Sequence, residues 1–279
     1  MIIKPNEIKT AQLHAYLLGS IAPRPICFAS TIDENGDANL SPFSFFNVFS
    51  SNPVTLIFSP ARRVRDNTIK HTLENCQATK EVVISVVNYD MVQQMSLASC
   101  EYPKGVSEFA KAGFTPLPAE KIKPFLVKES PVNMECIVKQ IIETGQEGGA
   151  GNLIICEMLQ MHLNENVLNE AGQIDPHKID LVARMGGDYY CRASGDAVFT
   201  VAKPNMNLGI GFDTLPEEIR KSDVLTGNDL AQLANVSQLP LIDHTYVYQA
   251  RNNKHLDAKE LILQGKIDEA WQILLTKTE

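Results

Sequence analysis

The chain has 279 residues, enough for one large domain with an extension or for two modest domains. Its hydrophobic fraction of 44% and charged fraction of 21% exclude a disordered or collagen-like chain. The formal net charge of -8 argues against nucleic acid or an acidic membrane surface as a partner. The sequence has no export signal and no apolar run near the roughly 20 residues that span a bilayer, so we expect a cytoplasmic protein.

Six cysteines are spread along the chain without CxxC pairs and without histidines at ligand spacing. They are Cys27, Cys76, Cys100, Cys136, Cys156 and Cys191. Three of them, Cys27, Cys136 and Cys156, lie in apolar runs, which is typical of buried, reduced thiols. The pattern predicts no metal site, and reduced thiols again favour the cytoplasm.

Up to about residue 195, short β-branched and apolar runs alternate with turn signals and predict strands. The predicted strands are residues 26–32, 38–40, 54–58, 82–87, 132–142 and 153–163. Asn35 and Gly36 indicate a hairpin between the first two. The runs 54–58 and 82–87 are continuously apolar, as in strands buried on both faces. Because the strands do not alternate regularly with long helices, we expect an antiparallel barrel or sandwich.

Helices are predicted between these strands and again in the last third of the chain. Residues 68–76 and 90–98 each begin with a residue that can cap a helix, Thr68 and Asp90. Beyond a loop-like stretch, helical patterns occur at about 214–222, 227–236, 257–265 and 267–274, with Asp257 and Glu260 resembling a capping box. We therefore expect a mainly β domain at 1–195 and a helical extension at 196–279, packed on the barrel or on a second subunit.

The segment NLSPFSFFNVFSSNP, residues 39–53, combines four phenylalanines with serines and asparagines. Buried polar groups need hydrogen-bond partners, so the segment raises the question of what its serines and asparagines bond to. Strand alternation predicts that Phe43 and Phe45 both lie on the face opposite Ser44.

Hydroxyl, amide and cationic side chains gather in residues 30–72. They are Ser30, Thr31, Ser41, Ser44, Asn47, Ser59, Arg62, Arg63, Arg65, Lys70 and Thr72. A phosphate group needs cations and such donors, best near a helix N-terminus, and the basic run leads into the predicted helix 68–76. The alternative is a solvated basic surface.

Several common site motifs are absent. Gly209 and Gly211 are followed by Thr214 where a third glycine would complete GxGxxG, and no strand leads into them. No GxSxG or HExxH occurs, and the six histidines are scattered. A Rossmann site, a nucleophile elbow and a zinc protease site are therefore not expected.

Three motifs occur in order within about residues 15–192: NLSPFSFFN followed by SNP and an apolar strand, KHTLEN at 70–75, and EVVISVVN. A later stretch ends in RMGGDYY. Together they resemble the flavin reductase-like family of FMN-binding split β-barrels, the flavoredoxin type. The resemblance implies an antiparallel split β-barrel of Greek-key type with helical inserts, which forms a homodimer with FMN at or near the subunit interface.

The resemblance also assigns residues to the flavin. Ser30 and Thr31 would line it; Ser41, Phe43, Ser44, Phe45 and Asn47 would wrap the ring and ribityl chain; Ser59, Arg62, Lys70 and Thr72 would hold the 5'-phosphate. His71 stands where the family usually has aspartate, so Lys70 lacks that neighbouring carboxylate.

The implied activity is that of an FMN-dependent oxidoreductase, which passes electrons from NADH or NADPH through non-covalently bound FMN to a flavin, a metal complex or another acceptor. No side chain is assigned a catalytic role, because the cofactor carries the chemistry. Three alternatives remain open: an FMN-binding electron carrier without turnover of its own, a flavin-free barrel that serves in binding or scaffolding, and a different chemistry on the same flavin, such as oxidation of an organic substrate.

Overall fold

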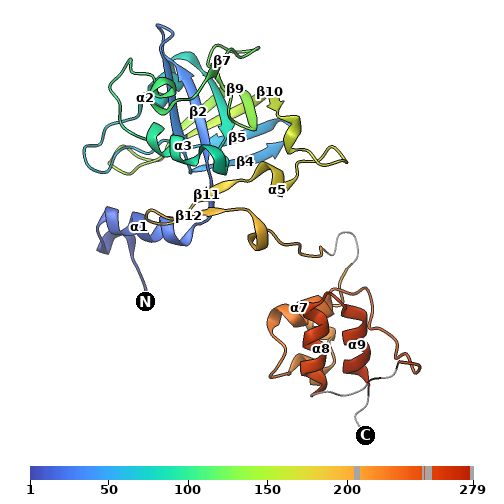
Figure 1. The fold of residues 1–279 in the computed structure, drawn as a ribbon. Helices are drawn as coiled ribbons and strands as arrows, with labels where there is room; N and C mark the ends of the chain where they lie inside the picture. The colour runs from blue at the N-terminus through green and yellow to red at the C-terminus, as the bar shows by residue number, and fades with distance from the viewer. Residues whose placement is uncertain (204–207, 247, 249–252, 277–279) are drawn as a thin grey trace. The chain divides into compact units, whose positions relative to one another are not determined.

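The computed structural model describes all residues except 204–207, 247, 249–252 and 277–279. The chain divides into two compact units, Met1–Phe199 and Thr200–Glu279 (Figure 1). Strands occur in the first unit, whereas the described part of the second consists of helices and loops. Among the described residues, no helix has the length and apolar character needed to cross a membrane.

Seven strands of the first unit form one antiparallel sheet, in the order β3-β2-β6-β9-β10-β5-β4. They are β2 (Cys27–Ile32), β3 (Ala38–Phe43), β4 (Phe46–Ser51), β5 (Val54–Phe58), β6 (Glu81–Val86), β9 (Val132–Glu143) and β10 (Asn152–Leu163). The predicted strands and their antiparallel arrangement are confirmed. The sequence prediction missed β4, whose exposed and half-buried residues give no strand-like alternation.

The β2–β3 hairpin is confirmed at the predicted turn. The Asp33 carboxylate accepts hydrogen bonds from the backbone N–H groups of Asn35, at 2.8 Å, and Asp37, at 3.0 Å. Gly36 has a φ of 91°, a left-handed conformation that costs glycine little. The turn therefore fixes the register in which β2 pairs with β3.

The two faces of the sheet bury different cores. One core joins β2, β3, β5, β6, β9, β10 and α2 (His71–Thr79); the other covers the opposite face of β2 and β3 with α3 (Val92–Ala98) and α4 (Glu108–Ala112). β6 is buried on both faces, as predicted. The prediction that β5 is also buried on both faces is wrong. This strand lies beside the edge strand β4, and only its Leu56 and Phe58 are buried.

The helix predicted at 68–76 begins three residues later than expected. Lys70 is the N-cap residue of α2, and the Thr68 hydroxyl instead donates to Asp66 Oδ1, at 2.6 Å. α2 packs on β2 and β3, while α3 and α4 pack on β3. The predicted helix at 90–98 is confirmed as a short 3-10 turn, η2 (Tyr89–Met91), followed by α3.

The remaining elements of the first unit lie outside the seven-stranded sheet and the helices packed on it. They are η1 (Pro5–Glu7), α1 (Thr10–Ser20), η3 (Glu165–Val167), α5 (Pro176–Ile179), η4 (Gly195–Ala197), a three-stranded sheet of β1 (Arg24–Pro25), β11 (Val182–Arg184) and β12 (Tyr190–Arg192), and the pair β7 (Pro116–Leu117) and β8 (Leu126–Val127).

All six cysteines are described and free, and the three in apolar runs are buried, as predicted. Burial raises the pKa of Cys76 and that of Cys136 to about 12. These thiols are therefore packing residues and poor nucleophiles at neutral pH.

The second unit has its own apolar core. Its elements are η5 (Phe212–Thr214), α6 (Glu217–Arg220), α7 (Gly227–Ala234), α8 (Lys254–Leu263) and α9 (Ile267–Leu275). Trp271 is fully buried, and its Nε1 donates to the carbonyl of Leu233, at 3.2 Å. The expected capping box at Asp257 is wrong, because α8 begins at Lys254 and is capped by Asn253.

Candidate functional site

The aromatic and serine-rich segment is divided at Ser44, because the chain bends there between β3 and β4. Phe43 ends β3 and is buried, with its ring centroid 5.2 Å from that of Phe58. Phe45 lies beyond the bend, is 40% exposed, and meets the His14 ring edge-on at 6.3 Å. The expected alternation through Ser44 is therefore wrong, since it requires one continuous strand.

Lys70 is an isolated cation at the start of α2. Its Nζ lies 5.5 Å from the centroid of the Phe43 ring, and it has no hydrogen bond or ion pair to any residue that the structure describes. Burial, and then the positive charge of Arg63, hold the pKa of Lys70 below its ordinary value. A half-buried cation without a counter-ion, at the positive end of a helix dipole, can stabilise a bound anion.

The arginines that precede Lys70 are engaged within the chain. Arg62 donates to the side-chain oxygen of Asn67, at 2.7 Å, and to its carbonyl, at 3.0 Å. Arg63 and Arg65 both pair with Glu101. These arginines therefore have acceptors within the chain, whereas the Lys70 side chain has none among the described residues.

Two of the predicted hydroxyls belong to a buried network between α2, β2 and β3. Thr72 Oγ1 donates to Asn39 Oδ1, at 2.9 Å, and Asn75 Nδ2 donates to Thr31 Oγ1, at 3.0 Å. Asn39 Nδ2 in turn donates to the buried carboxylate of Glu108, at 3.0 Å. These partners answer part of the question raised by the polar groups of residues 39–53, because Asn39 is satisfied inside the protein.

The other predicted serines lie in different places. Ser41 is half-buried and shares a face of β3 with Phe43, two residues away. Ser59 is buried, and its hydroxyl accepts a hydrogen bond from the backbone N–H of Asn152, at 3.1 Å. Ser30 is buried on the other face of β2, opposite Leu40, and its hydroxyl has no partner among the described residues.

Asn47 is separate from this group. It is exposed on β4, and its side-chain oxygen accepts a hydrogen bond from the N–H of Val48, at 2.8 Å. The structure therefore brings Ser41, Phe43 and Lys70 to one side of β3, while Ser30 and Asn47 lie elsewhere.

A cavity of about 180 Å³ opens beside the end of β3. Its lining residues are Ile26, Pro42, Phe43, Ser44, Met95, Ser99, Arg184 and Tyr190. It therefore reaches from the predicted segment to the β11–β12 hairpin. Arg184 and Tyr190 were not predicted as site residues, although both belong to the RMGGDYY stretch that contributes to the resemblance.

Close packing explains the glycines of this hairpin. A Cβ at Gly186 would lie 2.9 Å from the Cα of Gly19 in α1, so the backbones can approach only without a side chain. Gly187 adopts a φ of 58° in the turn itself. The pair fixes where the hairpin places Arg184 and Tyr190.

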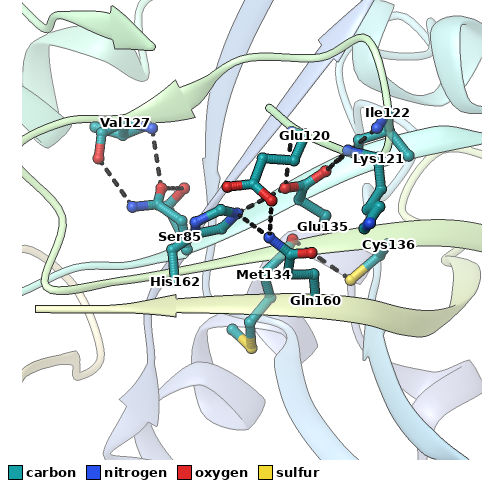
Figure 2. A network of polar contacts seen from close by, with 11 residues as sticks. Ser85, Glu120, Lys121, Ile122, Val127, Met134, Glu135, Cys136, Gln160 and His162 are labelled. Carbon is teal, nitrogen blue, oxygen red and sulfur yellow. Dashed lines mark hydrogen bonds and ion pairs between the residues drawn. The ribbon is translucent and has the colours of Figure 1, made fainter. Parts of the chain in front are cut away.

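A second polar cluster lies around Glu135 in β9 (Figure 2). The buried Glu135 carboxylate accepts hydrogen bonds from the N–H groups of Glu120, Lys121 and Ile122, at 3.0, 2.6 and 3.2 Å, and lies 2.6 Å from His162 Nε2. These contacts tie the 120–122 segment to the sheet. The cluster is satisfied internally, so we assign it a structural role.

A family model described as "Flavin reductase like domain" matches residues 18–180. An uncharacterized protein of Aquifex aeolicus is 34% identical over 200 residues, which are 72% of this chain and 98% of that protein. An uncharacterized protein of Halalkalibacterium halodurans is 31% identical over 192 residues, which are 68% of this chain and 91% of that protein.

Solved structures agree with the sequence matches. Nitrilotriacetate monooxygenase component B from Bacillus cereus is 28% identical, with a TM-score of 0.66 over 72% of this chain and 98% of that one. A protein with a split barrel domain from Shewanella frigidimarina is 25% identical, with a TM-score of 0.60 over 71% of this chain and 95% of that one. The flavoredoxin of Desulfovibrio vulgaris, at 21% identity and a TM-score of 0.55 over 72% and 97%, shares the fold.

These matches confirm the expected split-barrel fold and the resemblance on which it was based. They imply a flavin cofactor and an oxidoreductase function. This chain belongs to the flavin reductase-like family.

Proposed function

We propose that this protein binds FMN non-covalently as a homodimer and passes electrons from NADH or NADPH to a flavin, a metal complex or another acceptor. The observation that carries the proposal is Lys70, a half-buried cation at the start of α2 and beside Phe43 that forms no ion pair with any described residue. When bound, the flavin supplies two-electron redox chemistry. The chain's own residues bind and orient it.

The residues around β3 suit such a ligand. A flavin mononucleotide has a flat, largely apolar ring and a phosphate, so its pocket needs apolar walls, a few donors and a cation. In the proposal, Lys70 and the first N–H groups of α2 hold the phosphate. Ser41, Phe43 and Ser44 lie along the ribityl chain and ring. Ser30, Thr31, Phe45, Asn47, Ser59, Arg62 and Thr72 remain predicted cofactor residues. Of these, Arg62 and Thr72 already have protein partners and should add little to the affinity.

An absorption spectrum of the purified protein, before and after addition of NADH or NADPH, tests the activity. We expect flavin bands that bleach with at least one nucleotide, followed by steady nucleotide oxidation when excess flavin is present. A protein that stays yellow but inert to both nucleotides is a carrier, and the reductase proposal fails. A protein that takes up no added FMN ends the flavin proposal.

A Lys70→Ala variant tests the phosphate position. We expect FMN binding to weaken by about 1.5 to 3 kcal/mol, the range for a hydrogen bond to a charged group. Riboflavin, which has no phosphate, should bind both forms equally. Lys139→Ala is the matched control, because Lys139 is a largely exposed cation on β9 paired with Glu157. Unchanged FMN affinity in Lys70→Ala would show that the phosphate lies elsewhere.

A further inference from the structure

Two arginines face each other beside the 180 Å³ cavity without a carboxylate between them. Arg24 in β1 and Arg184 in β11 are directly opposite in the strand pairing. Like charges at such positions repel. Neither has an ion pair in the part of the chain that the structure describes, whereas Arg63, Arg65 and Arg192 each pair with a carboxylate.

Arg24 is held rigidly by neutral acceptors. It is only 6% exposed, and its guanidinium donates to the carbonyls of Leu18 and Ile21, each at 2.7 Å, and of Met185, at 3.0 Å. Its Nε lies 3.4 Å from the hydroxyl of Ser44. Carbonyl groups satisfy hydrogen-bond donors but do not neutralise the charge, so a buried positive charge remains. Burial, and then Arg184, lower the pKa of Arg24.

Arg184 places a second positive charge at the cavity wall. It donates to the Tyr190 hydroxyl and, at 2.9 Å, to the carbonyl of Gly187, and its guanidinium carbon lies 4.6 Å from the centroid of the Tyr190 ring. No lining residue of the cavity is acidic. The half-buried Arg184 thus offers a fixed guanidinium that can bind an oxyanion bidentately.

We infer that Arg184, supported by the charge of Arg24, is a second anion subsite, which binds the pyrophosphate of the nicotinamide dinucleotide. The assignment rests on the proposed function, in which Lys70 already accounts for the phosphate of FMN. A donor must place its nicotinamide against the flavin ring, and the cavity shares Phe43 and Ser44 with the proposed ring site. The other phosphate source is FMN itself, and the experiment separates the two.

Inorganic pyrophosphate is the probe, and its binding is measured by isothermal titration calorimetry on FMN-loaded protein. We expect saturable binding, weakened about ten- to a hundredfold in Arg184→Gln, the loss expected for a charge-assisted hydrogen bond. Arg184→Lys should recover part of it, and Lys139→Gln, which removes a charge from β9, should change nothing. In steady state, Arg184→Gln should raise the KM for the nucleotide with kcat nearly unchanged.

Three results would overturn the assignment. In the first, pyrophosphate does not bind to the wild-type protein, or binds Arg184→Gln equally well. In the second, FMN loading abolishes pyrophosphate binding and Arg184→Gln weakens FMN but not riboflavin, so the arginines hold the phosphate of FMN. In the third, Arg184→Gln alters the oligomeric state on a sizing column, which would mean that a second copy supplies the counter-ion.

Failure of the proposed function gives a different pattern. If the protein takes up no FMN, pyrophosphate titrated into apo Lys70→Ala still tests the arginines, because that variant lacks the other candidate cation. If pyrophosphate binds apo Lys70→Ala but not the double variant that also carries Arg184→Gln, the anion subsite is supported even without a flavin. No binding to apo Lys70→Ala rejects it.

Discussion

The polar clusters around Glu135 and around Lys70 are both set in the barrel unit, but only the first is complete within the chain. Glu135 has four partners from two segments, whereas Lys70 has an aromatic ring nearby and no side-chain acceptor in the described part of the chain. Polar groups that are satisfied internally stabilise the fold, and those left without partners mark places where a ligand supplies them. The two clusters should therefore respond to mutation in opposite ways.

The largest expected effect is on stability, from Glu135→Ala. We expect a loss of about 4 kcal/mol in the free energy of unfolding, because three backbone N–H groups, including that of the buried Ile122, and His162 lose a buried acceptor. FMN affinity should not change. Urea unfolding followed by circular dichroism measures the loss.

Two controls accompany this variant. Glu120→Ala removes an exposed carboxylate whose one hydrogen-bond donor among the described residues is Gln160, so it should cost within about 0.5 kcal/mol. Trp271 is the only tryptophan of the chain and reports on the second unit, so the midpoint of its fluorescence transition should stay unchanged. Equal losses in Glu135→Ala and Glu120→Ala would contradict the structural role of the buried carboxylate.

A smaller loss of folding stability is expected at acidic pH. Burial alone raises the pKa of Glu135, but the N–H of Glu120, the His162 side chain and the N–H of Lys121 outweigh it and hold the pKa below its ordinary value of 4.5. Since the folded-state pKa is the lower one, the stabilisation is present above the unfolded-state pKa and is lost as the pH falls through the folded-state pKa.

Urea midpoints measured between about pH 7 and pH 3 test this dependence. The wild-type protein should lose stability more steeply below about pH 5 than Glu135→Gln, which has no carboxylate to protonate. Parallel curves would show that other groups govern the acid response.

Thr72→Val tests whether the Thr72 hydroxyl serves the internal hydrogen-bond network or the ligand site. The change keeps the shape of the side chain but removes the donor to Asn39, so we expect a loss of about 1 kcal/mol in stability. FMN affinity should change little, because the hydroxyl already has a protein partner. A large drop in FMN affinity at unchanged stability would instead assign the hydroxyl to the phosphate.

The smallest effect is expected from Arg62→Ala on FMN affinity. Its guanidinium is bound to Asn67, so we expect less than about 0.5 kcal/mol, well below the loss in Lys70→Ala. A flavin titration of both variants compares the two cations directly. An equal loss would show that Arg62 leaves Asn67 to hold the phosphate.

Local sequence patterns predicted most of the barrel. Apolar, β-branched runs and the turn at Gly36 were sufficient for six strands, because hydrophobic periodicity and turn chemistry are local properties. β4 was missed because an edge strand with exposed residues carries no such pattern. The family resemblance supplied the candidate flavin residues, which composition and spacing alone would have left as a basic surface.

The sequence by itself determined the fold class, the helical tail, the reduced cysteines and the presence of a basic, hydroxyl-rich segment before α2. Only the tertiary structure decided which of these polar groups has a partner. Arg62 and Arg63 look equivalent to Lys70 in the sequence, yet Asn67 and the distant Glu101 engage them and leave Lys70 without an acceptor. The pairing of Arg24 with Arg184, 160 residues apart, likewise depends on long-range strand contacts. Electrostatic neighbours are set by folding, so charge in a sequence shows its function only when the packing is known.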